Sequence, residues 1–79
     1  MIIKILGIGC SKCKQLMNLT IQVVEELKLD AEIQKIEDIQ EIMIYGVMSI
    51  PALIVDDMVI FSGKIPTLKE LINIFYTLI

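Results

Sequence analysis

The sequence contains no histidine, no tryptophan and no arginine among its 79 residues. Without histidine, the chain has no imidazole for acid–base or nucleophilic relays, for Cys2His2 zinc sites or for axial ligation of haem. Its seven cationic side chains are all lysines and are outnumbered by ten acidic ones, which gives a formal net charge of -3. Such a chain offers no basic surface for a row of phosphates, so we expect no nucleic acid partner.

Long apolar runs are also missing, although 56% of the residues are hydrophobic. The longest ones extend over a handful of residues, far short of the roughly 20 that cross a bilayer. Lys4 interrupts the apolar N-terminus, and no small-residue cleavage site follows it. We therefore expect no membrane span, no secretory signal and a cytoplasmic location. The length allows one hydrophobic core, so residues 1–79 are predicted to form a single domain and a monomer.

Hydrophobic periodicity and turn residues predict an α/β fold with the order β-α-β-α-β-β-α. The predicted elements are a buried strand over 1–6, a long helix over 13–27 with Ser11 as its cap, an edge strand over 31–36, a short helix between 38 and 46, a hairpin of strands over 52–55 and 58–61, and a helix from 67 to the C-terminus. Two capping-box patterns support the later helices: Asp38 precedes Glu41, and Thr67 precedes Glu70, by three residues. The first β-α-β unit should form a right-handed parallel crossover.

Cys10 and Cys13 are the side chains best suited to chemistry. They lie where the first strand passes into the first helix, and side chains three apart on a helical turn are neighbours, at about 5–6 Å between Cβ atoms. The pair can therefore close and open a disulfide with little backbone movement. The helix start favours the thiolate and so lowers the pKa of the Cys10 thiol, which makes Cys10 the expected nucleophile. Cys13, one turn further, is expected to be buried and to resolve a mixed disulfide.

Two further features stand beside the cysteine pair. Lys12 is interpreted as a solvated lysine near the helix start, with a second interpretation in which its charge tunes Cys10 or steers acidic partners. Pro51 directly precedes a predicted strand, and taken alone the Ile50–Pro51 step indicates a rigid turn with an ordinary trans bond.

Three segments together resemble the thioredoxin-like superfamily, and within it the small, glutaredoxin-sized redox-active disulfide proteins of archaea and bacteria. These segments are 7–14 (GIGCSKCK), 45–53 (YGVMSIPAL) and 62–66 (SGKIP), and the resemblance covers essentially the whole chain. It implies a four-stranded mixed sheet in the order 2-1-3-4, with strand 3 antiparallel to strand 1. The first and third helices would cover one face and the second helix the other. It also implies a cis Ile50–Pro51 bond, with the backbone of Ile50 pairing with an extended substrate while Cys10 attacks the substrate disulfide.

The sequence departs from the better-known relatives at two places. The first strand carries Lys4 and no acidic residue, whereas thioredoxins bury a carboxylate beneath the disulfide, so the route of the Cys13 proton is open. The Gly-Gly-x-x-Asp pattern with which glutaredoxins hold glutathione is absent after the hairpin, where residues 62–65 read SGKI. The sequence therefore carries no signal for glutathione as a specific substrate.

The leading hypothesis is a thiol–disulfide oxidoreductase in which Cys10 attacks a disulfide of a protein or small molecule and Cys13 releases the reduced product. Its partners would be a disulfide-containing protein and a reductase that the sequence does not identify, and no cofactor or metal is expected. One alternative is a soft-metal carrier of the copper type, although those domains run β-α-β-β-α-β. Another is a redox-gated interaction module that docks a partner through Met48, Ile50 and Pro51.

Overall fold

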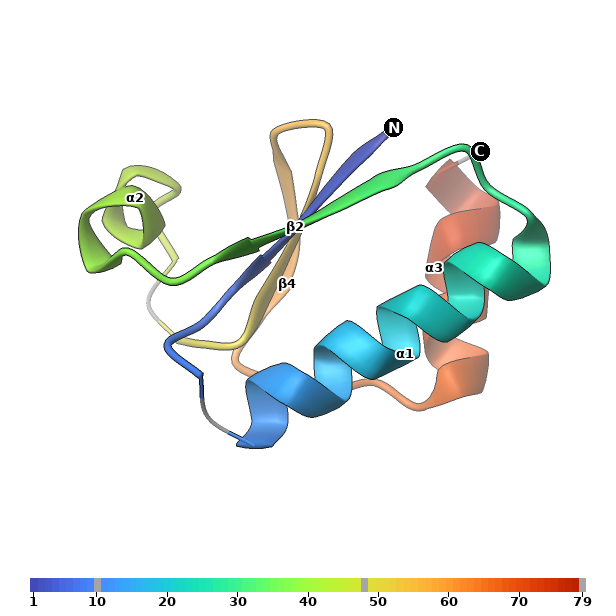
Figure 1. Ribbon diagram of the computed structural model, residues 1–79, viewed down its shortest axis with the longest axis horizontal. Helices are drawn as coiled ribbons and strands as arrows, with labels where there is room; N and C mark the ends of the chain where they lie inside the picture. Colours follow the sequence, from blue (N-terminus) through green and yellow to red (C-terminus); the bar gives the residue numbers. More distant parts are fainter. Residues whose placement is uncertain (10, 48, 79) are drawn as a thin grey trace.

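The computed structural model describes residues 1–9, 11–47 and 49–78, and its elements follow the predicted order (Figure 1). The strands are β1 (Ile2–Leu6), β2 (Glu32–Ile36), β3 (Ala52–Val55) and β4 (Met58–Ser62), and the helices are α1 (Ser11–Leu27), α2 (Ile39–Ile44) and α3 (Leu68–Leu78). The predicted boundaries agree within about two residues. The role of Ser11 was predicted wrongly, because Ser11 is itself helical rather than a cap that precedes the helix. None of the helices over the described residues is both long and apolar enough to cross a membrane.

The four strands form one mixed sheet in the order β2-β1-β3-β4, as the resemblance implies. β1 pairs in parallel with β2 and antiparallel with β3, and β4 closes the hairpin with β3. With a neighbour on each side, β1 has no open edge, and Ile3, Ile5 and Leu6 are buried. The β1–α1–β2 unit is thus the parallel crossover expected from the sequence, with α1 returning the chain along the sheet (Figure 1).

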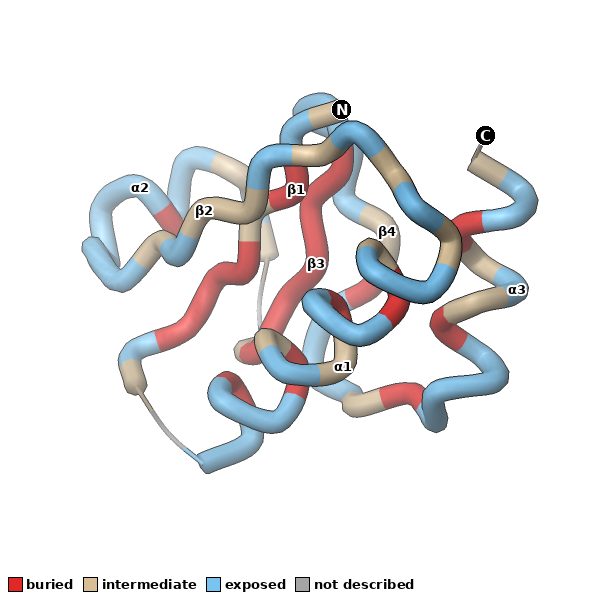
Figure 2. Tube along the Cα trace, turned by 45° about the vertical axis from the view of Figure 1, so that its right-hand side comes forward, coloured by how far each residue is buried: buried red, intermediate tan, exposed pale blue. Residues whose placement is uncertain are grey.

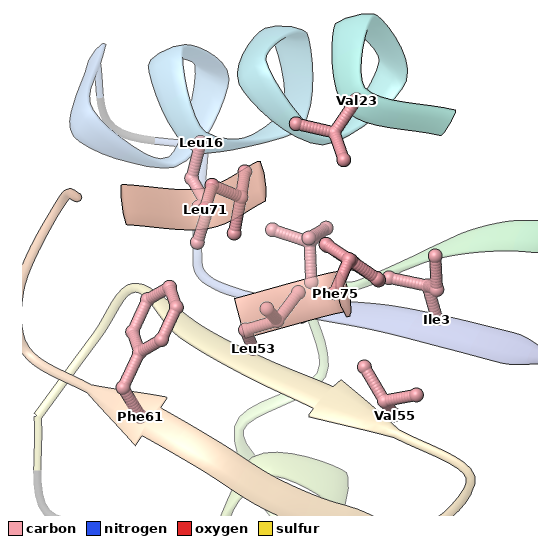
Figure 3. Packing of buried hydrophobic residues seen from close by; sticks show 9 residues of the cluster. Ile3, Leu16, Val23, Leu53, Val55, Phe61, Leu71 and Phe75 are labelled. Carbon is pink, nitrogen blue, oxygen red and sulfur yellow. The ribbon is translucent and has the colours of Figure 1, made fainter. Parts of the chain in front are cut away.

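Side chains alternate between the two faces of the sheet and divide the core into two clusters. The larger cluster lies under α1 and α3, where Leu53 of the sheet meets Phe75 (Figure 3). Its buried members are Ile3, Ile5, Leu16, Val23, Leu53, Val55, Phe61, Leu71 and Phe75. This face holds most of the buried hydrophobic side chains of the described chain.

The smaller cluster lies on the opposite face, under the short helix α2, and its buried members are Leu6, Ile42, Ala52 and Ile54. Figure 2 shows how much of α2 remains exposed, with one buried position in the helix. The first and third helices therefore cover one face and the second helix the other, which confirms the predicted arrangement of layers.

Local hydrogen bonds account for the element ends. Thr67 and Glu70 form the predicted reciprocal capping box: the Thr67 amide donates to Glu70 Oε1 at 3.0 Å, and the Glu70 amide donates to Thr67 Oγ1 at 3.2 Å. Asp38 caps α2 by accepting a bond from the Gln40 amide at 3.0 Å. The acidic pair between β3 and β4 adopts the left-handed conformations typical of a two-residue hairpin, with φ of 48° at Asp56 and 67° at Asp57.

Candidate active site

Cys13 lies in the first turn of α1 and is 3% exposed, which confirms its predicted burial. Its side chain packs against Gly7, the residue that follows β1. A Cβ atom at residue 7 would overlap Cys13 Sγ and would lie 2.9 Å from Cys13 Cβ. Gly7 is therefore required for its lack of a side chain, because the sulfur occupies the space where one would be.

The loop over residues 7–9 leads from β1 towards α1. It is tied to β2 by the Gly7 amide, which donates to the Ile36 carbonyl at 3.0 Å, and it turns at Gly9, whose φ of +83° favours glycine. The next residue, Cys10, lies outside the described residues. Its roles as nucleophile and disulfide partner therefore stay predictions.

A carboxylate that the sequence analysis missed lies against this loop. A Cβ atom at Gly9 would lie 3.5 Å from Glu37 Oε2, so the Glu37 carboxylate lies close to the backbone immediately before the cysteine pair. Glu37 also forms an ion pair with Lys35, with 3.7 Å between Lys35 Nζ and Glu37 Oε1. The two residues 9 and 37 are far apart in sequence, and only the parallel pairing of β1 and β2 brings them together.

The Ile50–Pro51 step lies directly before β3. Its peptide bond is cis, Pro51 is buried and Ile50 packs against the smaller cluster. The Gly63 amide donates to the Pro51 carbonyl at 2.8 Å, and a Cβ atom at Gly63 would lie 2.7 Å from Ser49 Cβ. Gly63, with a φ of +74°, thus allows the end of β4 to approach this step closely.

The strand register brings the three sequence segments to one end of the sheet. Leu6 pairs with Ala52, and Ala52 pairs with Ser62. The residues just beyond these pairs, Gly7, Pro51 and Gly63, therefore lie at the same end, and Cys13 packs against the first of them. The described parts of the three predicted signatures converge here, which the sequence indicated through the resemblance alone.

Lys12 is exposed in the first turn of α1, as expected for a solvated lysine, and its tuning role stays a prediction.

Lys4, the lysine inside β1, is held by contacts that its position in the sequence did not reveal. Its side chain is 23% exposed, and its Nζ donates to Tyr45 Oη at 2.6 Å and lies 3.6 Å from Asp57 Oδ1. The hydrogen bond to Tyr45, aided by the charge of Asp57, raises the pKa of Lys4 above its ordinary value. Lys4 therefore connects the end of α2 and the β3–β4 turn to the central strand.

Comparison with known proteins agrees with this geometry. The sequence profile of the thioredoxin domain family matches residues 1–76. A thioredoxin of Methanocaldococcus jannaschii is 43% identical over 70 residues, covering 89% of this chain and 80% of that protein. A thioredoxin of Methanothermobacter thermautotrophicus is 34% identical over 69 residues, covering 87% of this chain and 90% of that protein. The structure of thioredoxin 1 from the thermophilic eubacterium Thermosipho africanus is similar with a TM-score of 0.69, covering 99% of this chain and 93% of that one at 20% identity.

The chain belongs to the thioredoxin domain family, whose profile spans nearly all of it. It is a thioredoxin-type redox protein, and its class of activity is that of a thiol–disulfide oxidoreductase. The β-α-β-β-α-β order of the soft-metal alternative is not the order of this chain, because α3 follows β4.

Proposed function

We propose that the chain exchanges two electrons with substrate disulfides through a reversible Cys10–Cys13 disulfide. The observation that supports this most strongly is the burial of Cys13 against Gly7, at the end of the sheet where Pro51 and Gly63 also lie. A buried cysteine at the start of a helix, three residues after another cysteine, is the arrangement in which an intramolecular disulfide can form within one helical turn.

The reaction starts from the dithiol. The Cys10 thiolate attacks one sulfur of the substrate disulfide, the substrate S–S bond breaks, and the released substrate sulfur leaves as a thiolate that takes up a proton. Cys13 then loses its proton and attacks Cys10 Sγ in the mixed disulfide. The second substrate thiolate leaves and is protonated, and the Cys10–Cys13 disulfide remains. Two electrons pass to the substrate, and a reductase must supply two electrons to restore the dithiol.

The substrate in this proposal is an extended protein segment that carries a disulfide. It would pair with the backbone of Ile50, beside Pro51, while Cys10 attacks. Ile50 suits this role because it lies directly before β3 at the end of the sheet where Cys13 is buried. Lys12, exposed on the first turn of α1, would favour the thiolate and acidic substrates. In this proposal the protein acts as a monomer in the cytoplasm and has a reductase as its partner.

Reduction of insulin by dithiothreitol, catalysed by the purified protein, tests the proposal. Cys10→Ser and Cys13→Ser should both reduce the rate to that of dithiothreitol alone, because each removes one half of the disulfide. Mass spectrometry should detect a mixed disulfide that persists in Cys13→Ser, which keeps the nucleophile, and not in Cys10→Ser. Asn18→Ser, at an exposed position of the same helix, should retain the wild-type rate.

The outcomes separate this proposal from its alternatives. Insulin reduction by Cys10→Ser at the wild-type rate would contradict it. A protein that oxidises reversibly, reduces no disulfide substrate and changes its affinity for a partner on oxidation would instead be a redox-gated interaction module.

A further inference from the structure

We infer that the carboxylate of Glu37 tunes the redox equilibrium of the cysteine pair and holds it towards reducing potentials. This inference rests on the proposed function of Cys10 and Cys13. Glu37 lies outside the three signature segments, and its role is electrostatic rather than a contact with the substrate.

Two contacts bring Glu37 to the site. It is the first residue after β2, and the Ile36 carbonyl just before it accepts a hydrogen bond from the Gly7 amide at 3.0 Å. The Glu37 carboxylate then reaches the loop at Gly9, where a Cβ atom would lie 3.5 Å from its Oε2. Gly9 immediately precedes Cys10, so a negative charge lies beside the backbone that leads into the pair.

Other charges near the site act with or against Glu37. Lys35 lies 3.7 Å from it on β2, but both side chains are about half exposed, at 42% and 54%, so water and salt weaken this ion pair. Lys12 and Lys14 in the first turn of α1 are exposed cations, and Asp38 and Glu41 at the start of α2 add negative charge. The Asp38 carboxylate caps α2, whereas the Glu37 carboxylate reaches the loop.

The direction of the effect follows from the charge of a thiolate. A nearby carboxylate disfavours the thiolate and opposes the helix start and the lysines, which favour it. The oxidised pair carries no such charge. A less stable thiolate makes the reduced form of the pair less stable, and the pair therefore gives up its electrons more readily. In the opposite case, a stabilised reduced form makes the pair a strong oxidant.

Replacing Glu37 by glutamine should therefore make the pair more oxidising. The equilibrium constant with glutathione, measured by thiol trapping in thiol/disulfide buffers, should shift by about threefold at pH 7, or about 15 mV. The shift should approach about tenfold, or about 30 mV, at pH 9 and fall towards zero at pH 6. This pH profile arises because the charge matters only to the extent that the reduced protein holds a thiolate.

Two variants serve as controls. Glu41→Gln removes the same charge from an exposed position in α2 and should shift the equilibrium by clearly less than Glu37→Gln does, because Glu37 is the carboxylate that reaches the loop. Lys35→Gln removes the cation that partly offsets the negative charge of Glu37, and it should shift the equilibrium slightly in the reducing direction.

Each outcome is decisive. An equilibrium in Glu37→Gln equal to that of the wild type at every pH would overturn the inference and leave the proposed function standing. A shift that is the same at pH 6 and pH 9, or that Glu41→Gln reproduces, would also overturn it, because it would reflect a structural or net-charge effect. A wild-type protein without a reversible Cys10–Cys13 couple would instead contradict the proposed function itself.

Discussion

The two faces of the sheet are built differently. Among the residues that the structure describes, nine buried side chains under α1 and α3 form one apolar cluster that includes Leu53 and Phe75. Under α2, four buried side chains of the described part of the chain are joined by Lys4, whose Nζ lies 2.6 Å from Tyr45 Oη. Because hydrophobic stabilisation grows with the apolar area removed from water, the first face supplies most of the stability.

The two layers of the fold hold different residues of the candidate site. Cys13 projects from α1, the helix that packs on the well-filled face, whereas Ile50 packs with the smaller cluster. The residue predicted to resolve the disulfide is thus anchored to the more stable layer, and the residue predicted to pair with substrate belongs to the less stable one. Changes in the two layers should therefore affect stability to different degrees.

The largest effect is expected from Phe75→Ala. Phe75 is fully buried at the centre of the larger cluster, so its loss should lower the free energy of unfolding by about 3–5 kcal/mol. Ile42→Ala in α2 should cost about 2 kcal/mol, near the lower limit for a buried aliphatic side chain, because Ile42 is 7% exposed and has few buried neighbours. Urea denaturation of both variants measures the contrast, and equal losses would contradict the comparison.

A smaller effect is expected from Tyr45→Phe. This change removes the hydroxyl that accepts the Lys4 hydrogen bond but keeps the ring, whose centroid lies 5.3 Å from Lys4 Nζ. The loss of stability should be smaller than that of Ile42→Ala, and the pKa of Lys4 should return towards its ordinary value of 10.5, because the Tyr45 hydrogen bond is the main cause of its rise. NMR titration of the lysine side chains measures this, and an unchanged Lys4 pKa would show that the hydrogen bond does not form in solution.

The smallest effect concerns the exposed cap of α3. Hydrogen bonds from the Thr67 amide and hydroxyl lower the pKa of Glu70 below its ordinary value of 4.5. A lowered pKa in the folded state means that the contribution to stability is present above pH 4.5 and is lost as the pH falls through the folded-state value. Glu70→Gln should therefore lose less stability than the wild type between pH 4.5 and pH 2, as urea denaturation over this range would measure. Identical pH profiles would contradict the prediction.

The sequence predicted the elements well because their signals are local. The capping box at Thr67 and Glu70 and the acidic hairpin turn at Asp56 and Asp57 depend on residues within a few positions of one another. The strand order and the layers came from the resemblance, since periodicity states which residues are buried but not which strands are neighbours.

The parts that the sequence did not predict depend on contacts between distant segments. Lys4 and Tyr45 are 41 residues apart, and Glu37 meets Gly9 only because β1 and β2 pair in parallel. In α1, Val23 is fully buried, whereas its neighbour Val24 is partly buried against the same cluster. Consecutive residues of a helix point about 100° apart, and hydrophobic spacing alone does not state which of two adjacent valines is buried more deeply.

The side chains allowed at residues 7 and 13 depend on each other. The sulfur of Cys13 fills the volume that a methyl group on residue 7 would need, so the two positions compete for one space. An alanine at residue 7 is compatible with this backbone only if the side chain at residue 13 becomes smaller or moves. Transfer of this cysteine pair to another scaffold would therefore also require a glycine at the end of the preceding strand.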